Sequence, residues 1–246
     1  MQVLRFLFRA CLTFVWLIAG LMHLFLFFPF LGLAARHFSK KYWSVVLLKI
    51  CGVRVSQIGT PVIDGPVLFV TNHISWLDIF ILNCARATAF VAKSEIRQWP
   101  LIGWLASGAD TIFIERASRH AVHQVGESMR QHFVQAQAVG LFPEGTTSNG
   151  YALLPFYANL FEPARKAGAS IQPVVLKYYH HGRRSDFAAF IGDQTLLHNM
   201  WCVLGGTGTS VEMIFLPVIW DGEGEPPVRA ALSRAAHQVM EQTLLS

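Results

Sequence analysis

The sequence predicts an α/β domain with a mostly parallel sheet flanked by helices, preceded by a hydrophobic N-terminal helix or helix pair. First, no Asp, Glu, Lys or Arg lies between Arg9 and Arg36. Second, short apolar runs alternate with segments of helical spacing through the rest of the chain, as in α/β proteins. Third, polar residues follow several of these runs, where ligands bind to parallel sheets. We expect residues 1–50 to be a membrane-anchoring segment and residues 51–246 to be one catalytic domain.

The composition favours a lipid partner. Of the 246 residues, 53% are hydrophobic and only 14% are charged, against about 25% charged in an ordinary soluble domain. The net charge of +5 favours an anionic partner, and the apolar content favours phospholipid over nucleic acid. The four cysteines form no C-x-x-C pair, so we expect reduced thiols and no metal site.

The uncharged stretch Cys11–Ala35 is long enough to cross a bilayer, which takes about 20 apolar residues. His23 and Pro29 interrupt it. A spanning helix and a re-entrant or interfacial pair of helices in one leaflet are both compatible with this pattern.

A basic and aromatic segment follows the apolar stretch. Arg36, Lys40 and Lys41 precede Tyr42 and Trp43, a pattern typical of an amphipathic helix at the level of the lipid headgroups. Positive flanks favour the cytoplasmic face, here of a bacterial inner membrane. Arg5 and Arg9 make the other flank positive as well.

The remaining elements alternate along the chain. Apolar runs predict strands at residues 53–58, 67–71, 88–92, 111–114, 139–142, 171–178 and 211–219. Helical spacing predicts helices at about 76–82, 102–105, 117–137, 155–166 and 227–245.

His73 and Asp78 follow the strand predicted at residues 67–71. Side chains five positions apart lie about 140° apart on a regular helix, so these two can meet only if His73 stands before the helix. Asn72 or Ser75 could then cap it. In that arrangement Asp78 would orient the imidazole and His73 would act as a general base.

Other polar residues follow other strands. Lys93 and Arg116 are candidates for holding an anionic group, and Glu144 precedes Gly145 in a predicted tight turn. Carboxyl ends of parallel strands meet at one edge of a sheet, so we expect these residues to converge on His73.

The sequence contains a candidate base but no covalent nucleophile. G-x-S-x-G is absent, and Ser75 is only two positions from His73, a spacing that does not bring side chains together on a helix. This pattern favours a mechanism in which the base activates a substrate hydroxyl directly, within a ternary complex. The basic residues of 177–184, beside Tyr178 and Tyr179, favour lipid headgroups, and we expect no nucleic-acid partner.

Four segments in order resemble the lysophosphatidic acid acyltransferase family, the 1-acylglycerol-phosphate acyltransferases and their relatives. Asn72-His73-x4-Asp78 resembles its first motif, and residues 112–116 resemble the second. Phe142-Pro143-Glu144-Gly145-Thr146-Thr147-Ser148 resembles the third, F-P-E-G-T-R-S, and residues 171–175 resemble the fourth. The similarity covers roughly residues 50–220.

This resemblance implies a glycerolipid acyltransferase fold and an O-acyltransferase that moves a fatty acyl group from acyl-CoA or acyl-carrier protein to the hydroxyl of a lysolipid. These donors are substrates, and no cofactor is implied. His73 and Asp78 would be catalytic. The implied substrate-binding residues are Asn72, Lys93, Arg116, Glu144, Gly145, Thr146 and Thr147. An acyl thioesterase and a non-catalytic lipid-binding membrane protein are the alternatives from other classes.

Thr147 departs from the family pattern. It stands where members that make phosphatidic acid usually carry arginine, and the missing guanidinium removes a bidentate phosphate ligand. The form F-P-E-G-T-T-S is similar to relatives that acylate lyso-ornithine lipid or lysophospholipids with larger headgroups. Lysophosphatidic acid and lyso-ornithine lipid both stay open as acceptors.

Overall fold

The structure, a computed structural model, describes residues 1–114 and 119–246, with no side chains described for residues 119–123. The strands are β1 (Arg54–Ile58), β2 (Val67–Thr71), β3 (Thr88–Lys93), β4 (Ile112–Ile114), β5 (Ala138–Leu141), β6 (Ser170–His180), β7 (Arg183–Arg184) and β8 (Thr209–Phe215). The α-helices are α1 (Gln2–Leu26), α2 (Leu33–Cys51), α3 (Asp78–Ala85), α4 (Ile102–Gly108), α5 (Arg119–Val134), α6 (Glu162–Ala167), α7 (Leu196–Gly205) and α8 (Arg229–Leu245). Short 3-10 helices span η1 (Phe28–Phe30), η2 (Ser94–Gln98) and η3 (Ala158–Phe161).

The strands form one sheet in the order β1-β8-β6-β2-β5-β3-β4, with β7 paired to β6. The five strands from β6 to β4 run parallel, which confirms the mostly parallel sheet. β8 is antiparallel to β6, and β1 runs parallel to β8. The carboxyl ends of the five parallel strands therefore lie at one edge.

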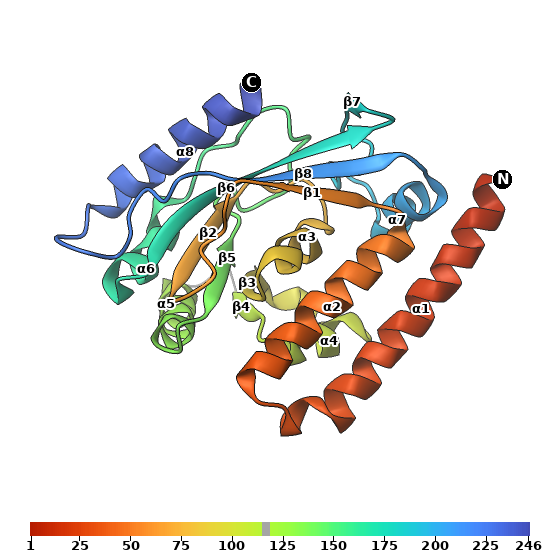
Figure 1. The fold of residues 1–246 in the computed structure, drawn as a ribbon, viewed down its shortest axis with the longest axis horizontal. Coiled ribbons are helices and arrows are strands. Elements are labelled where there is room, and N and C mark those ends of the chain that lie inside the picture. The colour runs from red at the N-terminus through yellow and green to blue at the C-terminus, as the bar shows by residue number, and fades with distance from the viewer. Residues whose placement is uncertain (115–118) are drawn as a thin grey trace.

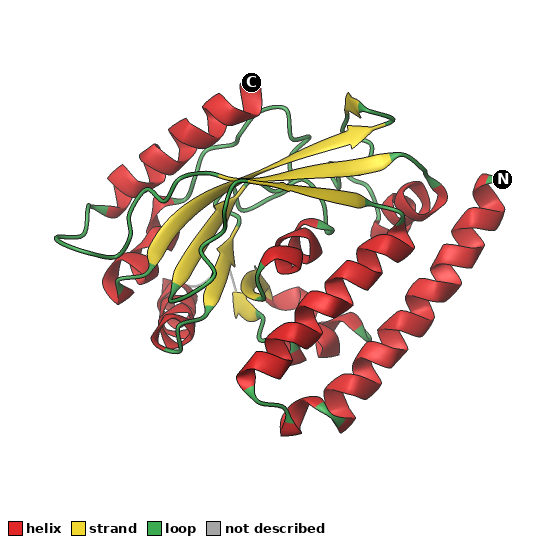
Figure 2. Ribbon diagram, viewed as in Figure 1, coloured by secondary structure: helices red, strands yellow, loops and turns green. Residues whose placement is uncertain are grey.

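Helices cover both faces of the sheet (Figures 1 and 2). Val67 and Phe69 of β2 belong to the core cluster that includes side chains of α2, α3 and α7. Leu68 and Val70 belong to the cluster that includes side chains of α5, α6 and α8. Successive residues of a strand point to opposite faces, so a strand buried on both faces has an apolar sequence throughout.

All of the predicted strands form, and three other details differ from prediction. The last strand ends at Phe215, because Pro217 cannot donate a hydrogen bond to a sheet. The helix predicted at 155–166 begins as the 3-10 turn η3 and continues as α6. Helix α7 was not predicted, although Thr195 caps it by accepting a hydrogen bond from the His198 N–H at 3.2 Å.

The N-terminal helices α1 and α2 form a pair joined by η1 (Figure 1). Near its start, α1 is fastened by Arg9, whose Nη1 donates to the carbonyl oxygens of Cys51, Leu204 and Gly206 at 3.2, 3.2 and 2.8 Å. Near its end, Leu24 lies so close to α4 that a Cβ on Gly108 would be 2.3 Å from it. Helix α1 therefore lies against the domain along its length.

Helix α2 contributes to the domain core as well as to this pair. Its residues Leu47, Leu48 and Cys51 are buried in the core cluster beside α3 and α7. The division predicted between residues 50 and 51 falls at the last turn of this helix. All four cysteines, each in the described part of the chain, are free.

Candidate active site

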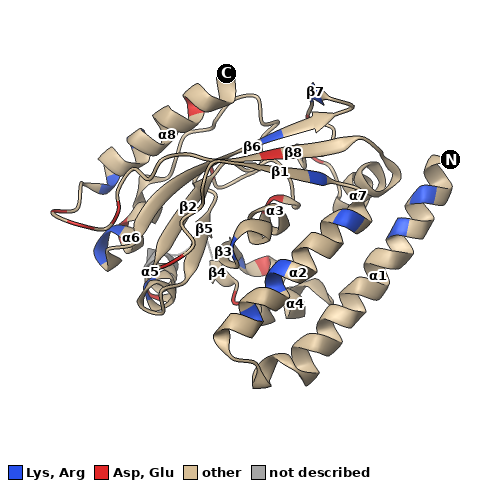
Figure 3. Cartoon of the chain, in the orientation of Figure 1, with Lys and Arg blue, Asp and Glu red and all other residues tan. Residues whose placement is uncertain are grey.

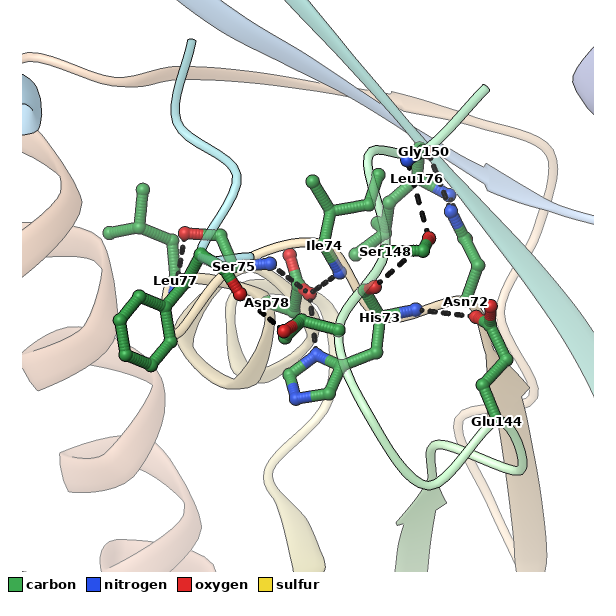
Figure 4. A network of polar contacts seen from close by, with 12 residues as sticks. Asn72, His73, Ile74, Ser75, Leu77, Asp78, Glu144, Ser148, Gly150 and Leu176 are labelled. Carbon is green, nitrogen blue, oxygen red and sulfur yellow. Dashed lines mark hydrogen bonds and ion pairs between the residues drawn. The ribbon is translucent and has the colours of Figure 1, made fainter. Parts of the chain in front are cut away.

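His73 lies in the loop between β2 and α3, before the helix begins at Asp78. Its Nδ1 is 2.8 Å from Asp78 Oδ2 (Figure 4). This placement confirms that the pair meets because His73 stands outside the helix. The predicted capping by Asn72 or Ser75 is wrong: the N-cap of α3 is Leu77, without a side-chain cap. The Asp78 carboxylate instead folds back and binds the N–H groups of the loop before it.

Four donors surround the Asp78 carboxylate, which is fully buried. Besides His73, Oδ2 accepts hydrogen bonds from the backbone N–H groups of Ile74 and Ser75 at 2.7 and 2.9 Å. Oδ1 accepts from the hydroxyl of Tyr178 at 2.5 Å. Hydrogen bonds to a carboxylate favour its charged form. An ionised Asp78 assigns the proton to His73 Nδ1 and leaves Nε2 able to accept one.

Asn72 ties this loop to the neighbouring strand. Its Nδ2 donates to the Leu176 carbonyl oxygen at 3.0 Å, and the Leu176 N–H donates to its Oδ1 at 2.8 Å (Figure 4). The side chain is 1% exposed. Sequence reasoning had it binding substrate, and its contacts are those of a residue that positions the loop.

The Glu144 side chain connects the loop of His73 to the loop of Leu154. Its Oε1 accepts from the His73 backbone N–H and its Oε2 from the Leu154 N–H, both at 2.9 Å. Burial raises the pKa of the Glu144 carboxyl, and these two N–H groups offset part of that rise. Glu144 was predicted to shape the acceptor site, and in the structure it reaches that site through the backbone of His73.

An aromatic side chain covers one side of the base. The Phe142 ring stacks on the His73 imidazole with their centroids 3.9 Å apart, and Phe90 stacks on Phe142 at 5.8 Å. This stack limits rotation of the imidazole and keeps one of its faces dry.

The turn after Glu144 is built as the sequence indicates. Gly145 has φ +70°, and a Cβ there would lie 2.9 Å from the Tyr157 ring. A side chain is therefore excluded on both counts. Thr146 is exposed, while the Thr147 hydroxyl donates to the Phe190 carbonyl oxygen.

The same turn supports the loop of His73 through its backbone. The Ser148 N–H donates to the His73 carbonyl oxygen at 2.7 Å, and the Phe190 N–H donates to that of Ile74 at 2.9 Å. The Ser148 hydroxyl also donates to the His73 carbonyl oxygen, at 3.4 Å (Figure 4). Thr147 is therefore bonded to Phe190, which itself holds the loop of His73. No guanidinium is supplied at this position.

Of the two basic residues predicted to hold an anionic group, Lys93 lies in the described part of the chain and Arg116 does not. Lys93 ends β3 with its side chain exposed, on the edge of the sheet that carries His73. Arg116, with Glu115, lies outside the described residues. The predicted convergence on His73 is confirmed for Glu144, which binds the His73 N–H, while Lys93 shares the same edge of the sheet.

Sequence reasoning missed the part played by Tyr178. We grouped it with the basic residues of 177–184 as an aromatic neighbour. In the structure it is 2% exposed and turns away from them toward Asp78. The sequence of β6 carries no local signal for this contact, because side chains on both faces of the strand are buried.

A mostly parallel sheet with a His–Asp pair at its carboxyl edge, and no side-chain nucleophile in the motif, is compatible with a group-transfer enzyme. The Acyltransferase family model matches residues 52–177. This chain belongs to the acyltransferase family, which confirms the resemblance, and it is an enzyme of that class.

Relatives and a solved structure agree with this assignment. The chain is 37% identical over 179 residues to a lyso-ornithine lipid O-acyltransferase of Pseudomonas aeruginosa, covering 73% of this chain and 68% of that protein. It is 34% identical over 171 residues to a 1-acyl-sn-glycerol-3-phosphate acyltransferase of Neisseria gonorrhoeae, covering 69% and 67%. The crystal structure of the 1-acyl-sn-glycerophosphate acyltransferase of Thermotoga maritima shares the fold, with TM-score 0.69, 20% identity and coverage of 99% and 96%.

Proposed function

We propose that this enzyme transfers a fatty acyl group from acyl-CoA or acyl-carrier protein to the free hydroxyl of a lysolipid. The observation that carries the proposal is the His73–Asp78 pair, 2.8 Å apart, in a chain related to lysolipid acyltransferases. The pair supplies a base for a hydroxyl and nothing that would form an acyl-enzyme.

Each step can be written with this chain's residues. His73 Nε2 removes the proton of the acceptor hydroxyl as its oxygen attacks the thioester carbonyl carbon. Asp78 stabilises the imidazolium that forms. The tetrahedral intermediate collapses, the C–S bond breaks, and the imidazolium returns its proton to the leaving thiolate. The products are the acylated lipid and the free thiol of the donor.

An acyl-transfer assay with a panel of lysolipid acceptors tests this proposal. Purified protein in lipid vesicles is given labelled acyl-CoA or acyl-carrier protein, with lysophosphatidic acid, lyso-ornithine lipid or no acceptor. Label appearing in a diacyl product only when a lysolipid is present supports the proposal. Label released as free fatty acid at the same rate with and without acceptor identifies a thioesterase instead.

Within this reaction, lyso-ornithine lipid is our proposed acceptor in preference to lysophosphatidic acid. The Thr147 hydroxyl donates its hydrogen bond to the Phe190 carbonyl oxygen, and the side chain has no positive charge that could bind a phosphomonoester. The relative in Pseudomonas aeruginosa carries the lyso-ornithine lipid name, and so does one in Brucella abortus, 34% identical over 220 residues.

Replacing Thr147 by Arg is expected to raise the ratio of kcat/KM for lysophosphatidic acid to that for lyso-ornithine lipid by about tenfold, because a guanidinium binds phosphate through charge-assisted hydrogen bonds. Thr146→Arg is the matched control, since it adds the same charge at the exposed neighbouring position. An equal change of the ratio in both variants would contradict a specific role for position 147.

We also propose that the N-terminal pair anchors the enzyme to one leaflet, at the cytoplasmic face. Among the described residues, α1 is the one helix long and apolar enough to cross a membrane. Of its most apolar 18-residue stretch, only 11% is buried against the rest of the protein. Its two arginines, Arg5 and Arg9, lie near its N-terminal end (Figure 3). Apolar side chains that α1 leaves exposed include Leu4, Leu7, Phe8, Phe14, Val15, Met22, Phe25 and Leu26.

The contacts of α1 favour interfacial anchoring over spanning. Arg9 holds its start to α2 and α7, and Leu24 holds its end to α4. A helix of 25 residues that crossed the bilayer would have to break these contacts or carry the domain into the membrane. Lying flat, it can bury its apolar face among lipid headgroups and acyl chains.

Protease-cleavable tags before Met1 and after Ser246 test the topology in sealed vesicles. We expect protease added to inside-out vesicles to remove both tags, and protease added to right-side-out vesicles to remove neither. Cleavage of the two tags from opposite sides would show that α1 spans the membrane.

A further inference from the structure

The side chain of Tyr178 lies against the catalytic pair from a strand 100 positions away in sequence. Its hydroxyl donates to Asp78 Oδ1 at 2.5 Å, while His73 binds the other carboxylate oxygen. The Tyr178 hydroxyl therefore binds the group that orients His73, and it also interacts with the Ser75 side chain.

The surroundings make this contact rigid. Tyr178 is 2% exposed and Asp78 is 0% exposed, so water does not compete for either group. Two residues earlier on β6, Leu176 binds both polar atoms of the Asn72 side chain. One strand therefore holds the catalytic loop at its start, through Asn72, and at its end, through Asp78.

The Tyr178 hydroxyl is a donor here. Burial and the neighbouring Asp78 carboxylate raise the pKa of Tyr178 well above its ordinary value, so the proton stays on the phenol. Oδ2 already has three donors. With Oδ1 bound to Tyr178, the carboxylate cannot rotate about its Cβ–Cγ bond without breaking several hydrogen bonds.

We propose that Tyr178 is a positioning residue for catalysis: it fixes the Asp78 carboxylate from strand β6 and thereby sets the orientation and basicity of His73. The inference rests on the proposed role of His73 as the base. Within the described part of the chain, two titratable side chains interact with His73 or Asp78: Tyr178, through Asp78, and Glu144, which accepts a hydrogen bond from the His73 backbone N–H.

Tyr178→Phe removes only the hydroxyl. The expected result is a kcat about tenfold lower, as for a lost hydrogen bond to a charged group, with KM for donor and acceptor unchanged. Without that hydrogen bond, the Asp78 carboxylate interacts more strongly with the imidazolium that forms on His73. The acid limb of the pH profile of kcat/KM therefore moves to higher pH.

Tyr179→Phe is the matched control, since it removes a hydroxyl that binds Glu212 at 2.7 Å on the same strand. We expect it to leave the acid limb in place. The thermal melt of each variant reports any loss of packing separately. In an Asp78→Asn background, Tyr178→Phe should no longer move the acid limb, because the charge through which it acts is gone.

A wild-type acid limb in Tyr178→Phe would overturn the proposal, whatever the melting temperature. So would a shift that persists undiminished in the Asp78→Asn background. If His73→Ala proves to retain activity, the failure lies with the proposed base itself, and that result is independent of the Tyr178 profile.

Discussion

Replacing His73 by Ala is expected to lower kcat/KM for acyl transfer by about 10²- to 10⁴-fold, the usual contribution of a general base. The acceptor hydroxyl then has no group to take its proton as it attacks the thioester. Because the His73 side chain is 21% exposed and its backbone N–H still binds Glu144, we expect the fold and the membrane binding to be retained. Steady-state rates with labelled donor, together with a thermal melt, measure both.

His198→Ala is the matched control. His198 is an exposed histidine on α7 whose Nε2 lies 3.9 Å from Cys202 Sγ, so we expect an unchanged rate. A His73→Ala variant that is folded and retains more than about a tenth of the activity would exceed what loss of a general base permits. It would remove His73 from the mechanism.

Replacing Asp78 by Asn is expected to have the second largest effect, a fall in kcat/KM of about 10²-fold or more, because a neutral amide does not stabilise the imidazolium. The hydrogen bonds can be kept. The amide oxygen can accept from Ile74 and Ser75 while the amide N–H donates to Tyr178, whose hydroxyl can also accept. We therefore expect a well-folded protein with a poor base.

Asp78→Ala separates charge from structure. It leaves buried N–H groups of Ile74 and Ser75 without an acceptor, at a cost of about 1–3 kcal/mol for each unsatisfied group. Chemical denaturation should show this loss for Ala and much less of it for Asn. Equal activity of Asp78→Asn and wild type would contradict the proposed orientation of His73 by a charged partner.

Much of the fold follows from local patterns in the sequence. In β2, Val67 and Leu68 pack against different helix layers, so both faces of the strand are buried and its sequence is apolar throughout. A continuous apolar run of this kind predicts a buried strand. The His73–Asp78 pair was predictable because both residues lie within one loop and the first turn of a helix. The reversed direction of β8 was not, since a strand's residues do not record which way it runs.

The contacts that hold the pair in place were harder to predict. Asn72 binds Leu176 and Asp78 binds Tyr178 across 104 and 100 positions, and no local pattern announces either contact. Asn72 has a polar side chain beside His73, which suggests substrate binding until the strand order brings β6 next to β2. Register between distant strands decides such roles.

In the proposed mechanism His73 activates the acceptor hydroxyl directly, and no acyl-enzyme forms. Rapid-quench mass spectrometry of the purified enzyme mixed with labelled acyl donor, with and without lysolipid, tests it most directly. We expect unmodified protein and intact thioester in the absence of acceptor, and a diacyl product within one turnover once lysolipid is present. Acyl label bound covalently to the protein, or released as fatty acid at an equal rate without acceptor, would contradict it.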